Sequence, residues 1–272
     1  SALGLSSVGG TMNMVTKSTE AKRGGSAYFG IGNDGYRKYS VSLSTGLMDN
    51  GWAVTLMGAL NTGDGYVKGT NYEGWTYFGN ISKVINEHHK LSLTAFGAPQ
   101  WHNQRGTMHY IEDYKNSPDG GRYINGVLTG SGYGYNFYHK PQISLNHYWT
   151  INEQSSLSTS LYASIATGGG RRVRGNHTEW LTIDYNTGRP KDGAMMTTDG
   201  LIDFHSAMEA NAASENGSEV IFTNAINDHK WYGLLSSYKN RFTENFTLTG
   251  GFDGRYYRGY HAEKIDDLLG GA

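Results

Sequence analysis

Arginines in the run Arg171-Arg172-Val173-Arg174 are the residues best suited to bind an anion. Guanidinium groups hold a carboxylate or a phosphate through paired hydrogen bonds. The preceding segment places its even-numbered residues, from Ser156 to Ser164, on one polar face. If this register continues through the glycines at 168–170, Arg172 and Arg174 point to that same face. A glycine triplet also accommodates a β-bulge, and solvated charges or salt bridges to loop acids are the alternative interpretation.

A second group of candidates is the aromatic and polar residues of a segment at 101–138 that has the character of a long loop. Aromatic rings with hydrogen-bond donors nearby suit a sugar, a haem or an iron chelate equally well. Binding groups concentrate on loops, although most such side chains pack the loop against its neighbours. The predicted ligand-binding residues are Trp101, Arg105, His109, Tyr133, Tyr135, Arg172 and Arg174.

Other polar clusters do not reach a catalytic or metal-binding set. His177-Thr178-Glu179 and His88-His89 each lack the full set of ligands that a metal ion needs. Asp253 and Arg255 are interpreted as an ion pair, since an enzyme would need a nucleophile with its base, or paired acids, at one place. We therefore expect no catalytic residue, no metal and no cofactor.

Extended segments with alternating polarity must position these residues. Between Tyr39 and Leu47, the odd positions are mostly apolar and the even positions are serines and a glycine. This pattern is typical of a strand with one apolar and one polar face. Similar alternation recurs along the chain and predicts about nine strands, each near the length of about 9–11 residues that a tilted membrane strand needs.

The connections between these segments are of two kinds that largely alternate. Short polar turns occupy residues 48–51, 86–89, 152–155 and 243–245, and the first contains Asn50-Gly51, a hairpin signal. The long connections cover residues 101–138 and 168–228, far more than the about 4–6 residues usual in a compact domain. Turns at one rim and long loops at the other are typical of an outer-membrane β-barrel.

Composition is compatible with a barrel and excludes other classes. The 272 residues include 39 Gly, 20 Tyr and no Cys, and the formal net charge is -1. No stretch approaches the about 18 consecutive apolar residues of a spanning helix, so a helical membrane protein is excluded. The charge gives no basic footprint for nucleic acid.

The order of parts resembles that of TonB-dependent outer-membrane receptors. Their plug domain commonly ends in a Gly-Gly-x-x-Asn-x-x-Thr-Lys type sequence, which Gly9, Gly10, Asn13, Thr16 and Lys17 match. The segment from Leu91 to Trp101 also looks like a strand-to-loop passage of these receptors. The resemblance covers the whole chain in order, but only as part of a receptor whose barrel has 22 strands.

The resemblance implies an all-β fold: part of an antiparallel transmembrane β-barrel with short periplasmic turns and long extracellular loops, preceded by the last plug strand. Residues 1–19 would be the end of the plug domain, 20–24 a linker and 25–272 the first part of the barrel. The open edges and odd strand number indicate a fragment, because unpaired backbone groups are costly in lipid. Arg172 and Arg174 would then point into the lumen near its outer mouth.

The implied function is TonB-dependent import of a scarce solute, such as a siderophore, haem, cobalamin or an oligosaccharide, across the bacterial outer membrane. The implied partners are outer-membrane lipid, TonB through a segment upstream of Ser1, an extracellular small solute and, as a further candidate, a surface lipoprotein. A passive porin or a surface adhesion barrel without energy coupling is the alternative. A barrel enzyme is the third class, and it would need a catalytic constellation at one rim.

Overall fold

The structure is a computed structural model of the chain, and it describes residues 18–67, 69–104, 111, 122–124, 127–129, 134–184, 186–187, 190–198 and 202–272. Side chains are not described at Ser18 or within β7 and β8. The expected last plug strand, including Gly9 to Lys17, lies outside the described residues. No helix in the described ranges is long and apolar enough to cross a membrane.

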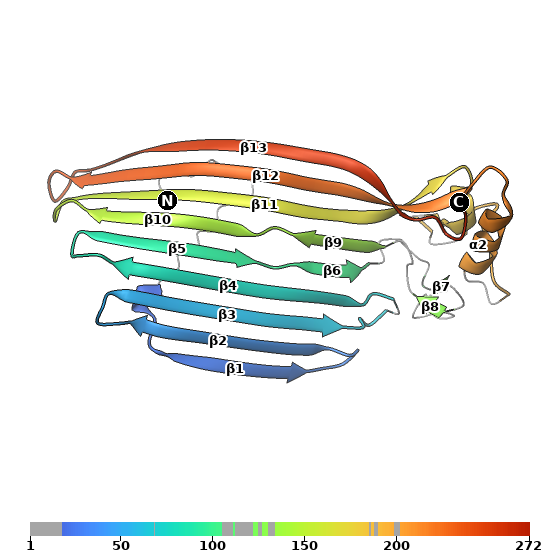
Figure 1. The fold of residues 1–272 in the computed structure, drawn as a ribbon, viewed down its shortest axis with the longest axis horizontal. Helices are drawn as coiled ribbons and strands as arrows, with labels where there is room; N and C mark the ends of the chain where they lie inside the picture. Colours follow the sequence, from blue (N-terminus) through green and yellow to red (C-terminus); the bar gives the residue numbers. More distant parts are fainter. Residues whose placement is uncertain are drawn as a thin grey trace.

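A single antiparallel sheet makes up most of the molecule (Figure 1). Its neighbours follow the order β1-β2-β3-β4-β5-β10-β11-β12-β13, and this path of nine strands is called the wall. The count agrees with the nine strands predicted from alternation. The bounds are β1 Gly24–Ile31, β2 Arg37–Leu47, β3 Trp52–Gly63, β4 Tyr72–Val84, β5 His89–Gly97, β10 Gln142–Thr150, β11 Ser155–Gly175, β12 Val220–Arg241 and β13 Thr247–Asp267.

Two short strands continue the middle of the wall beyond a break. β6 (Gln100–Asn103) follows β5 after Pro99, and β9 (Tyr135–His139) precedes β10 before Pro141. β6 and β9 pair with each other, as β5 and β10 do. Proline has no N–H to donate to a ladder, so one proline in each of two adjacent strands interrupts both at the same level. A separate pair, β7 (Arg122–Ile124) with β8 (Val127–Thr129), completes the described strands.

The two faces of the wall differ in polarity along continuous cross-strand rows. One row is aliphatic and crosses six strands, through Val54, Ile81, Leu93, Leu145, Leu161 and Leu234. The neighbouring row on the other face is polar, through Ser82, Ser92, Asn146 and Ser160. Because consecutive residues of a strand point to opposite faces, the sheet has an apolar face and a polar face. The alternation predicted from the sequence is confirmed.

Buried hydroxyl and amide groups hold neighbouring strands together on the polar face. Asn80 donates to Ser92 Oγ at 2.8 Å and to Thr94 Oγ1 at 2.7 Å. Ser82 donates to Asn80 Oδ1 at 2.7 Å. All four side chains are buried, and each is hydrogen-bonded, as buried polar groups must be if they are not to destabilise the fold.

Short turns join the strands at one rim, and longer connections join them at the other (Figure 1). In the predicted Asn50-Gly51 hairpin, Gly51 has φ of +79° and its N–H donates to Met48 O at 2.8 Å. In the turn after β4, Asn86 Oδ1 accepts from the N–H groups of His88 and His89, at 2.9 Å each. One short connection, residues 32–36, lies at the other rim among the longer ones.

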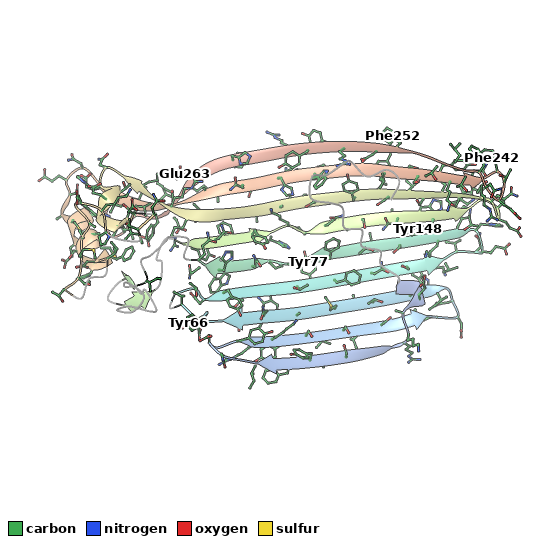
Figure 2. All side chains as sticks on the ribbon, turned by 180° about the vertical axis from the view of Figure 1, so that it is seen from behind. Tyr66, Tyr77, Tyr148, Phe242, Phe252 and Glu263 are labelled. Carbon is green, nitrogen blue, oxygen red and sulfur yellow. The ribbon has the colours of Figure 1, made fainter. Side chains whose placement is uncertain are left out.

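The three longest strands project beyond the others toward the long-loop rim (Figure 1). β11, β12 and β13 have 21, 22 and 21 residues, whereas β1 to β5 and β10 have 8 to 13. In Figure 2, Phe242 marks the short-turn end, Phe252 a middle level and Glu263 the projecting end.

The prediction of a loop from 168 to 228 is therefore wrong at both ends, since β11 continues to Gly175 and β12 begins at Val220. The first loop is likewise shorter than 101–138, because β6 and β9 lie within it.

The apolar face changes character along this projection. Tyr232, Leu161 and Ile165 lie on the apolar face of the lower part, but the same face carries Lys230, Asp228 and Arg171 farther out. From Ile165 to Gly175, β11 extends by ten residues, or roughly 34 Å. The apolar band thus ends well before the strands do.

A compact unit, called the cap, lies at the outer end of β11 to β13 and comprises the described residues of 176–219 with 268–272. It contains η2 (Thr178–Leu181) and α2 (Phe204–Ala213). Asp203 caps α2, because its carboxylate accepts from Ser206 N at 3.0 Å and from Ser206 Oγ at 2.7 Å. The described part of this connection folds around a core of its own.

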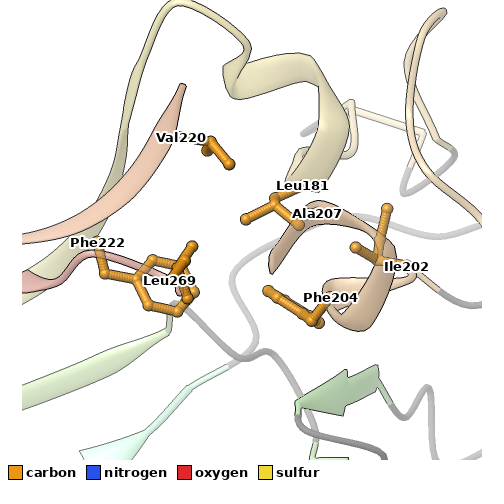
Figure 3. Close-up of a cluster of buried hydrophobic side chains, with 7 residues drawn as sticks. All are labelled: Leu181, Ile202, Phe204, Ala207, Val220, Phe222 and Leu269. Atoms are coloured by element: carbon orange, nitrogen blue, oxygen red, sulfur yellow. The ribbon is translucent and has the colours of Figure 1, made fainter. Parts of the chain in front are cut away.

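The cap core consists of side chains from four separate segments (Figure 3). Its buried members are Leu181, Ile202, Phe204, Ala207, Val220, Phe222 and Leu269. Asn211 of α2 is also buried, and it donates to Val220 O at 2.7 Å and to Leu269 O at 3.0 Å. Its Oδ1 accepts from Glu219 N at 2.9 Å and from Val220 N at 3.1 Å. One amide side chain therefore fastens the helix to the start of β12 and to the segment after β13.

At the short-turn rim, the described chain begins with η1 (Ser18–Glu20), which packs against β2, β3 and β4. The chain then passes close to Gly46, which has φ of +65°, and a Cβ there would lie 3.0 Å from Arg23 N. β1 begins at Gly24, the last residue of the expected linker. The expected boundary at residues 19–24 stays a prediction.

Candidate functional site

The pairing of β11 with β12 decides where the arginine run points. The register is unbroken from Ser155↔Asn240 to Gly175↔Val220, including Gly169↔Ile226 and Gly170↔Ala225. No bulge occurs at the glycine triplet, so even-numbered residues stay on the polar face throughout. Arg172 and Arg174 share this face, as the first of the two sequence interpretations requires.

The three arginines have different surroundings. Arg171, on the opposite face, lies 2.6 Å from Asp266 Oδ2 and stacks over the rings of Tyr135 and Phe222. Arg174 Nε lies 2.7 Å from Glu263 Oε1. The alternative of salt bridges to acids thus holds for these two. Arg172 is exposed, and it makes no hydrogen bond or ion pair within the described part of the chain.

A hollow of about 360 Å³ lies beside Arg172 on the polar face. Glycines form its floor because Gly168 and Gly170 present no side chain to this face. Asn136 lies across the floor, since a Cβ on Gly170 would come within 3.1 Å of Asn136 Nδ2. This polar-face hollow is lined by Gln104, Asn136, Phe137, Tyr138, Lys140, Gly168, Gly169, Gly170, Arg171, Arg172, Ala225 and Asn227.

The side chains around the hollow are mostly hydrogen-bond donors. Lys140 Nζ lies over the Tyr138 ring, 5.7 Å from its centroid, and the described residues include no carboxylate paired with it. Asn227 Oδ1 lies 2.7 Å from His261 Nδ1, so its amide oxygen is engaged. Its Nδ2 lies 3.5 Å from Ala225 O, which leaves the second N–H of the NH₂ group as a donor. The nearby acid, Glu263, is engaged by Arg174 and by Thr223 Oγ1, the latter at 2.6 Å. The hollow is therefore lined by three cations, of which Arg171 is paired with Asp266, and by three side-chain amides, with no carboxylate in its lining.

The aromatic candidates lie on the other face. Trp101 pairs with Phe137, which pairs with Gly169, and this row is continuous with the apolar face of β11. The Trp101 and Tyr135 ring centroids are 6.2 Å apart, and those of Tyr135 and Phe137 are 5.8 Å apart. The structure brings Trp101 and Tyr135 together with Arg171, not with Arg172 and Arg174.

The remaining predicted ligand contacts, Arg105, His109 and Tyr133, lie outside the described residues. Sequence reasoning did not single out Lys140, Asn136 or Asn227. Two signals were available: Pro141 after Lys140 marks a strand break, and Tyr135, Phe137 and His139 alternate with Asn136, Tyr138 and Lys140. Both indicate a strand at this position, but its place beside the glycine triplet follows only from the pairing of Gly170 with Asn136.

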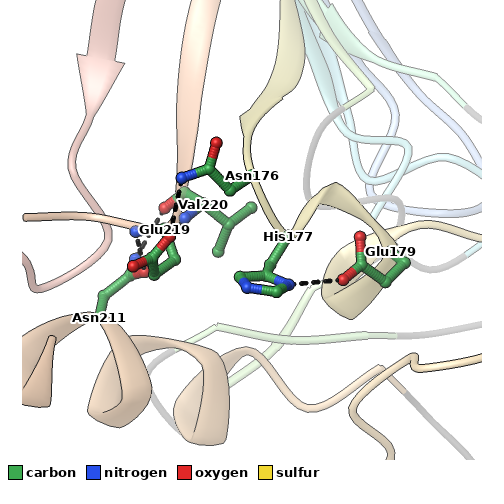
Figure 4. Close-up of polar contacts among 6 residues, drawn as sticks. All are labelled: Asn176, His177, Glu179, Asn211, Glu219 and Val220. Atoms are coloured by element: carbon green, nitrogen blue, oxygen red, sulfur yellow. Dashed lines mark hydrogen bonds and ion pairs between the residues drawn. The ribbon is translucent and has the colours of Figure 1, made fainter. Parts of the chain in front are cut away.

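Two other pairs noted in the sequence also form contacts. His177 Nδ1 lies 2.8 Å from Glu179 Oε1 (Figure 4), and the His177 ring stacks on Trp180 with centroids 4.6 Å apart. The hydrogen bond from His177 holds the pKa of Glu179 below its ordinary value. Asp253 and Arg255 form the expected ion pair, with Nε to Oδ1 at 2.9 Å. The described residues contain no group of three or more His, Asp or Glu able to hold a metal ion.

Comparison with known proteins gives a structural relationship without a sequence relationship. No protein-family model matches the sequence, and no curated protein matches it. Among solved structures, the unliganded ferric citrate transporter FecA matches with a TM-score of 0.52 and 10% identity, over 89% of this chain and 32% of that chain. The chain has the fold of part of a TonB-dependent transporter.

This match shows the fold and no more, because the identity is low. The chain spans about a third of the transporter's length, in agreement with the partial receptor that the sequence resemblance implies. The all-β antiparallel class is confirmed. No enzyme family is detected.

Proposed function

We propose that this chain forms part of the wall of a receptor that imports a scarce solute across the bacterial outer membrane with energy from TonB. The observation that carries the proposal is the separation of the two faces in a sheet with this fold. An aliphatic row across six strands needs an apolar solvent, and the polar rows behind it need water. A bilayer outside and a lumen inside supply both.

The proposed orientation follows from the rims. The short turns face the periplasm, and the cap and longer connections face the exterior, where the solute is first met. Outer-membrane lipid covers the apolar face. TonB acts through a plug segment preceding the barrel, and a surface lipoprotein is a further candidate partner at the outer rim.

Aromatic side chains support the proposed membrane level. Trp52, Trp149, Phe242 and Phe246 are exposed near the short turns, and Tyr39, Trp75, Tyr77, Tyr232 and Tyr256 are exposed farther out. Amphipathic rings at two levels suit the two membrane interfaces. The polar upper part of β11 to β13 then stands outside the bilayer.

The solute class is a proposal with several members: a ferric siderophore, haem, cobalamin or an oligosaccharide. The test starts with the full-length protein, purified from its native membrane, and mass spectrometry of the small molecule that copurifies. That molecule is labelled, and its binding and uptake are measured in cells with and without TonB. We expect surface binding in both strains and uptake only where TonB and the proton-motive force are present. Equal uptake without TonB would contradict the proposal and indicate a passive pore.

A further inference from the structure

The polar-face hollow at the outer part of the wall has features that point to a ligand group of defined charge. Its floor is glycine, its volume is about 360 Å³, and it adjoins the lumen side of the proposed receptor. We infer that this hollow binds the anionic oxygens, carboxylate or phosphate, of the imported solute. That this solute is imported rests on the proposed function, whereas binding of the anion at the hollow does not depend on TonB.

Two cations beside the hollow, Arg172 and Lys140, have no carboxylate partner among the described residues. Arg171 and Arg174, the immediate neighbours of Arg172, each have a carboxylate partner at 2.6–2.7 Å. Arg172 has none in the described part of the chain, and neither has Lys140. Cations that line a concave surface attract anions more strongly than cations on an open surface do, because the low-dielectric protein walls focus the field. A carboxylate or phosphate is the group that would complete this set.

Two side-chain amides beside the hollow, Asn136 and Asn227, have N–H groups that can donate to a ligand. Asn227 presents one N–H of its NH₂ group, because His261 Nδ1 lies 2.7 Å from its oxygen and the other N–H donates to Ala225 O at 3.5 Å. The Asn136 amide lies over Gly170 and makes no side-chain hydrogen bond to another described residue. Both amides can donate to anionic oxygens alongside the cations. The acidic side chain close to Arg172, Glu263, is already engaged by Arg174 and Thr223, and Arg172 acts on it only through the electrostatic field, without a direct contact.

The two cations lie at opposite ends of the hollow. Gly170 pairs with Asn136, and Gly168 pairs with Tyr138. By the same register, Arg172 lies at the outer end of the hollow and Lys140 about six residues lower, or roughly 20 Å between Cα atoms. Both side chains are long enough to reach inward from the two ends. This arrangement fits an elongated solute with more than one anionic group better than it fits a single small anion.

The test is calorimetric titration of the purified full-length protein in detergent with two probes, tricarballylate and inorganic tripolyphosphate. The neutral trimethyl ester of tricarballylate is the uncharged control. The two anionic probes distinguish a carboxylate preference from a phosphate preference. We expect saturable binding of at least one anion, weaker binding at high salt, and no binding of the ester.

Two variants remove the cations, and each has a matched control. Arg172→Gln is compared with Lys239→Gln, which removes one charge from the same face near the short turns. Lys140→Gln is compared with Lys90→Gln, because Lys90 also lies over a tyrosine ring, Tyr148, at 4.7 Å. We expect about a tenfold or greater loss of affinity for R172Q, a smaller loss for K140Q, and less than about a twofold change for both controls.

A third variant, Gly170→Val, changes the volume of the hollow and leaves the charge unchanged. It should weaken anion binding, because its side chain occupies the floor beside Asn136. Absence of saturable binding for both anions would overturn the inference, and so would an equal loss in the control variants. Neither result would touch the proposed function, which is judged by TonB-dependent uptake. Binding with this pattern and uptake without TonB would uphold the site and contradict the import mechanism.

Discussion

The wall and the cap of this protein are built on opposite principles. The cap buries Phe204 completely within a core of its own, whereas the wall leaves Phe252 59% exposed on its apolar face. Most large apolar side chains of the wall are exposed, and outside the cap core its buried apolar residues are Ala53, Ala166 and Ile226. The cap is stabilised by packing within the chain, but the wall depends on its ladders and on the apolar solvent outside.

The same kind of substitution should therefore change stability by different amounts in the cap and in the wall. In the cap, a lost side chain leaves a cavity that surrounding atoms fill only partly. In the wall, lipid chains can fill the space left by an outward residue, but they cannot accept a charge. The following predictions test this contrast.

The largest effect is expected for Phe204→Ala in the cap core. Removing a fully buried phenylalanine costs about 3–5 kcal/mol of local stability. Hydrogen exchange of α2 in the full-length protein, followed by mass spectrometry, measures this cost as faster exchange. Phe252→Ala makes the same chemical change in the wall and should cause a clearly smaller change in its own strand. Equal effects at the two sites would remove the distinction between the regions.

An arginine placed at either of two adjacent residues of β11 should distinguish the apolar face of the wall from the polar face. Leu161→Arg puts a guanidinium on the apolar face at a middle level, and the expected loss of unfolding free energy is about 2–4 kcal/mol. Ser160→Arg puts the same group on the polar face and should change it by less than about 1 kcal/mol. Denaturant unfolding of the full-length protein in lipid vesicles measures both. A similar cost for both variants would contradict the assignment of the faces.

The smallest effect is expected for acidification of the cap. Hydrogen bonds from Asn176 and Ser214 to the Glu219 carboxylate, each 3.0 Å long, lower the pKa of Glu219 below its ordinary value of 4.5. A carboxylate with a lowered folded-state pKa contributes stability above its unfolded-state pKa. This contribution is lost as the pH falls below about 4.5 and through the folded-state pKa.

The exchange rate of the cap amides, divided by the intrinsic exchange rate at each pH, should therefore rise at acidic pH, and Glu219→Gln should reduce that rise. Exchange in the lower wall is the internal control, because this carboxylate makes no contact there. An unchanged pH response in the variant would exclude Glu219 as the titrating group.

The fold could be predicted from sequence where one face of a strand is apolar and the other polar. Tyr39 to Leu47 is the clearest case, and the hairpin after it was found from Asn50-Gly51. The method failed in the upper parts of β11 and β12, where Asp228, Asn224 and Arg171 occupy the face that is apolar below. Strands that have left the apolar solvent are polar on both faces, and alternation cannot reveal them.

The cap could not be predicted because its core is assembled from distant segments. Leu181, Phe204 and Leu269 come together only in three dimensions. α2 carries a buried Asn211 and has no clear apolar stripe in its sequence, since its stability comes from backbone partners in other elements.

The candidate site was half predictable. The face on which Arg172 lies could be predicted from the alternation along its strand. Lys140 and Asn136 could not be predicted, because they lie directly after and within β9, which becomes a neighbour of the glycine triplet only through the pairing of Gly170 with Asn136. The ligand contact of every predicted residue stays a prediction.

The junction of the cap has a consequence for how this molecule can vary. Gly175 and Val220 face each other as the last pair of the β11–β12 ladder, so the chain leaves and re-enters the sheet at one place. Gly175 has φ of +119°, and a side chain there would collide with the Glu219 carbonyl. Everything between these two residues can lengthen, shorten or be exchanged without shifting a single pair below. An insertion at this point would therefore change the outer end of the molecule and leave the ladder of the wall as it is.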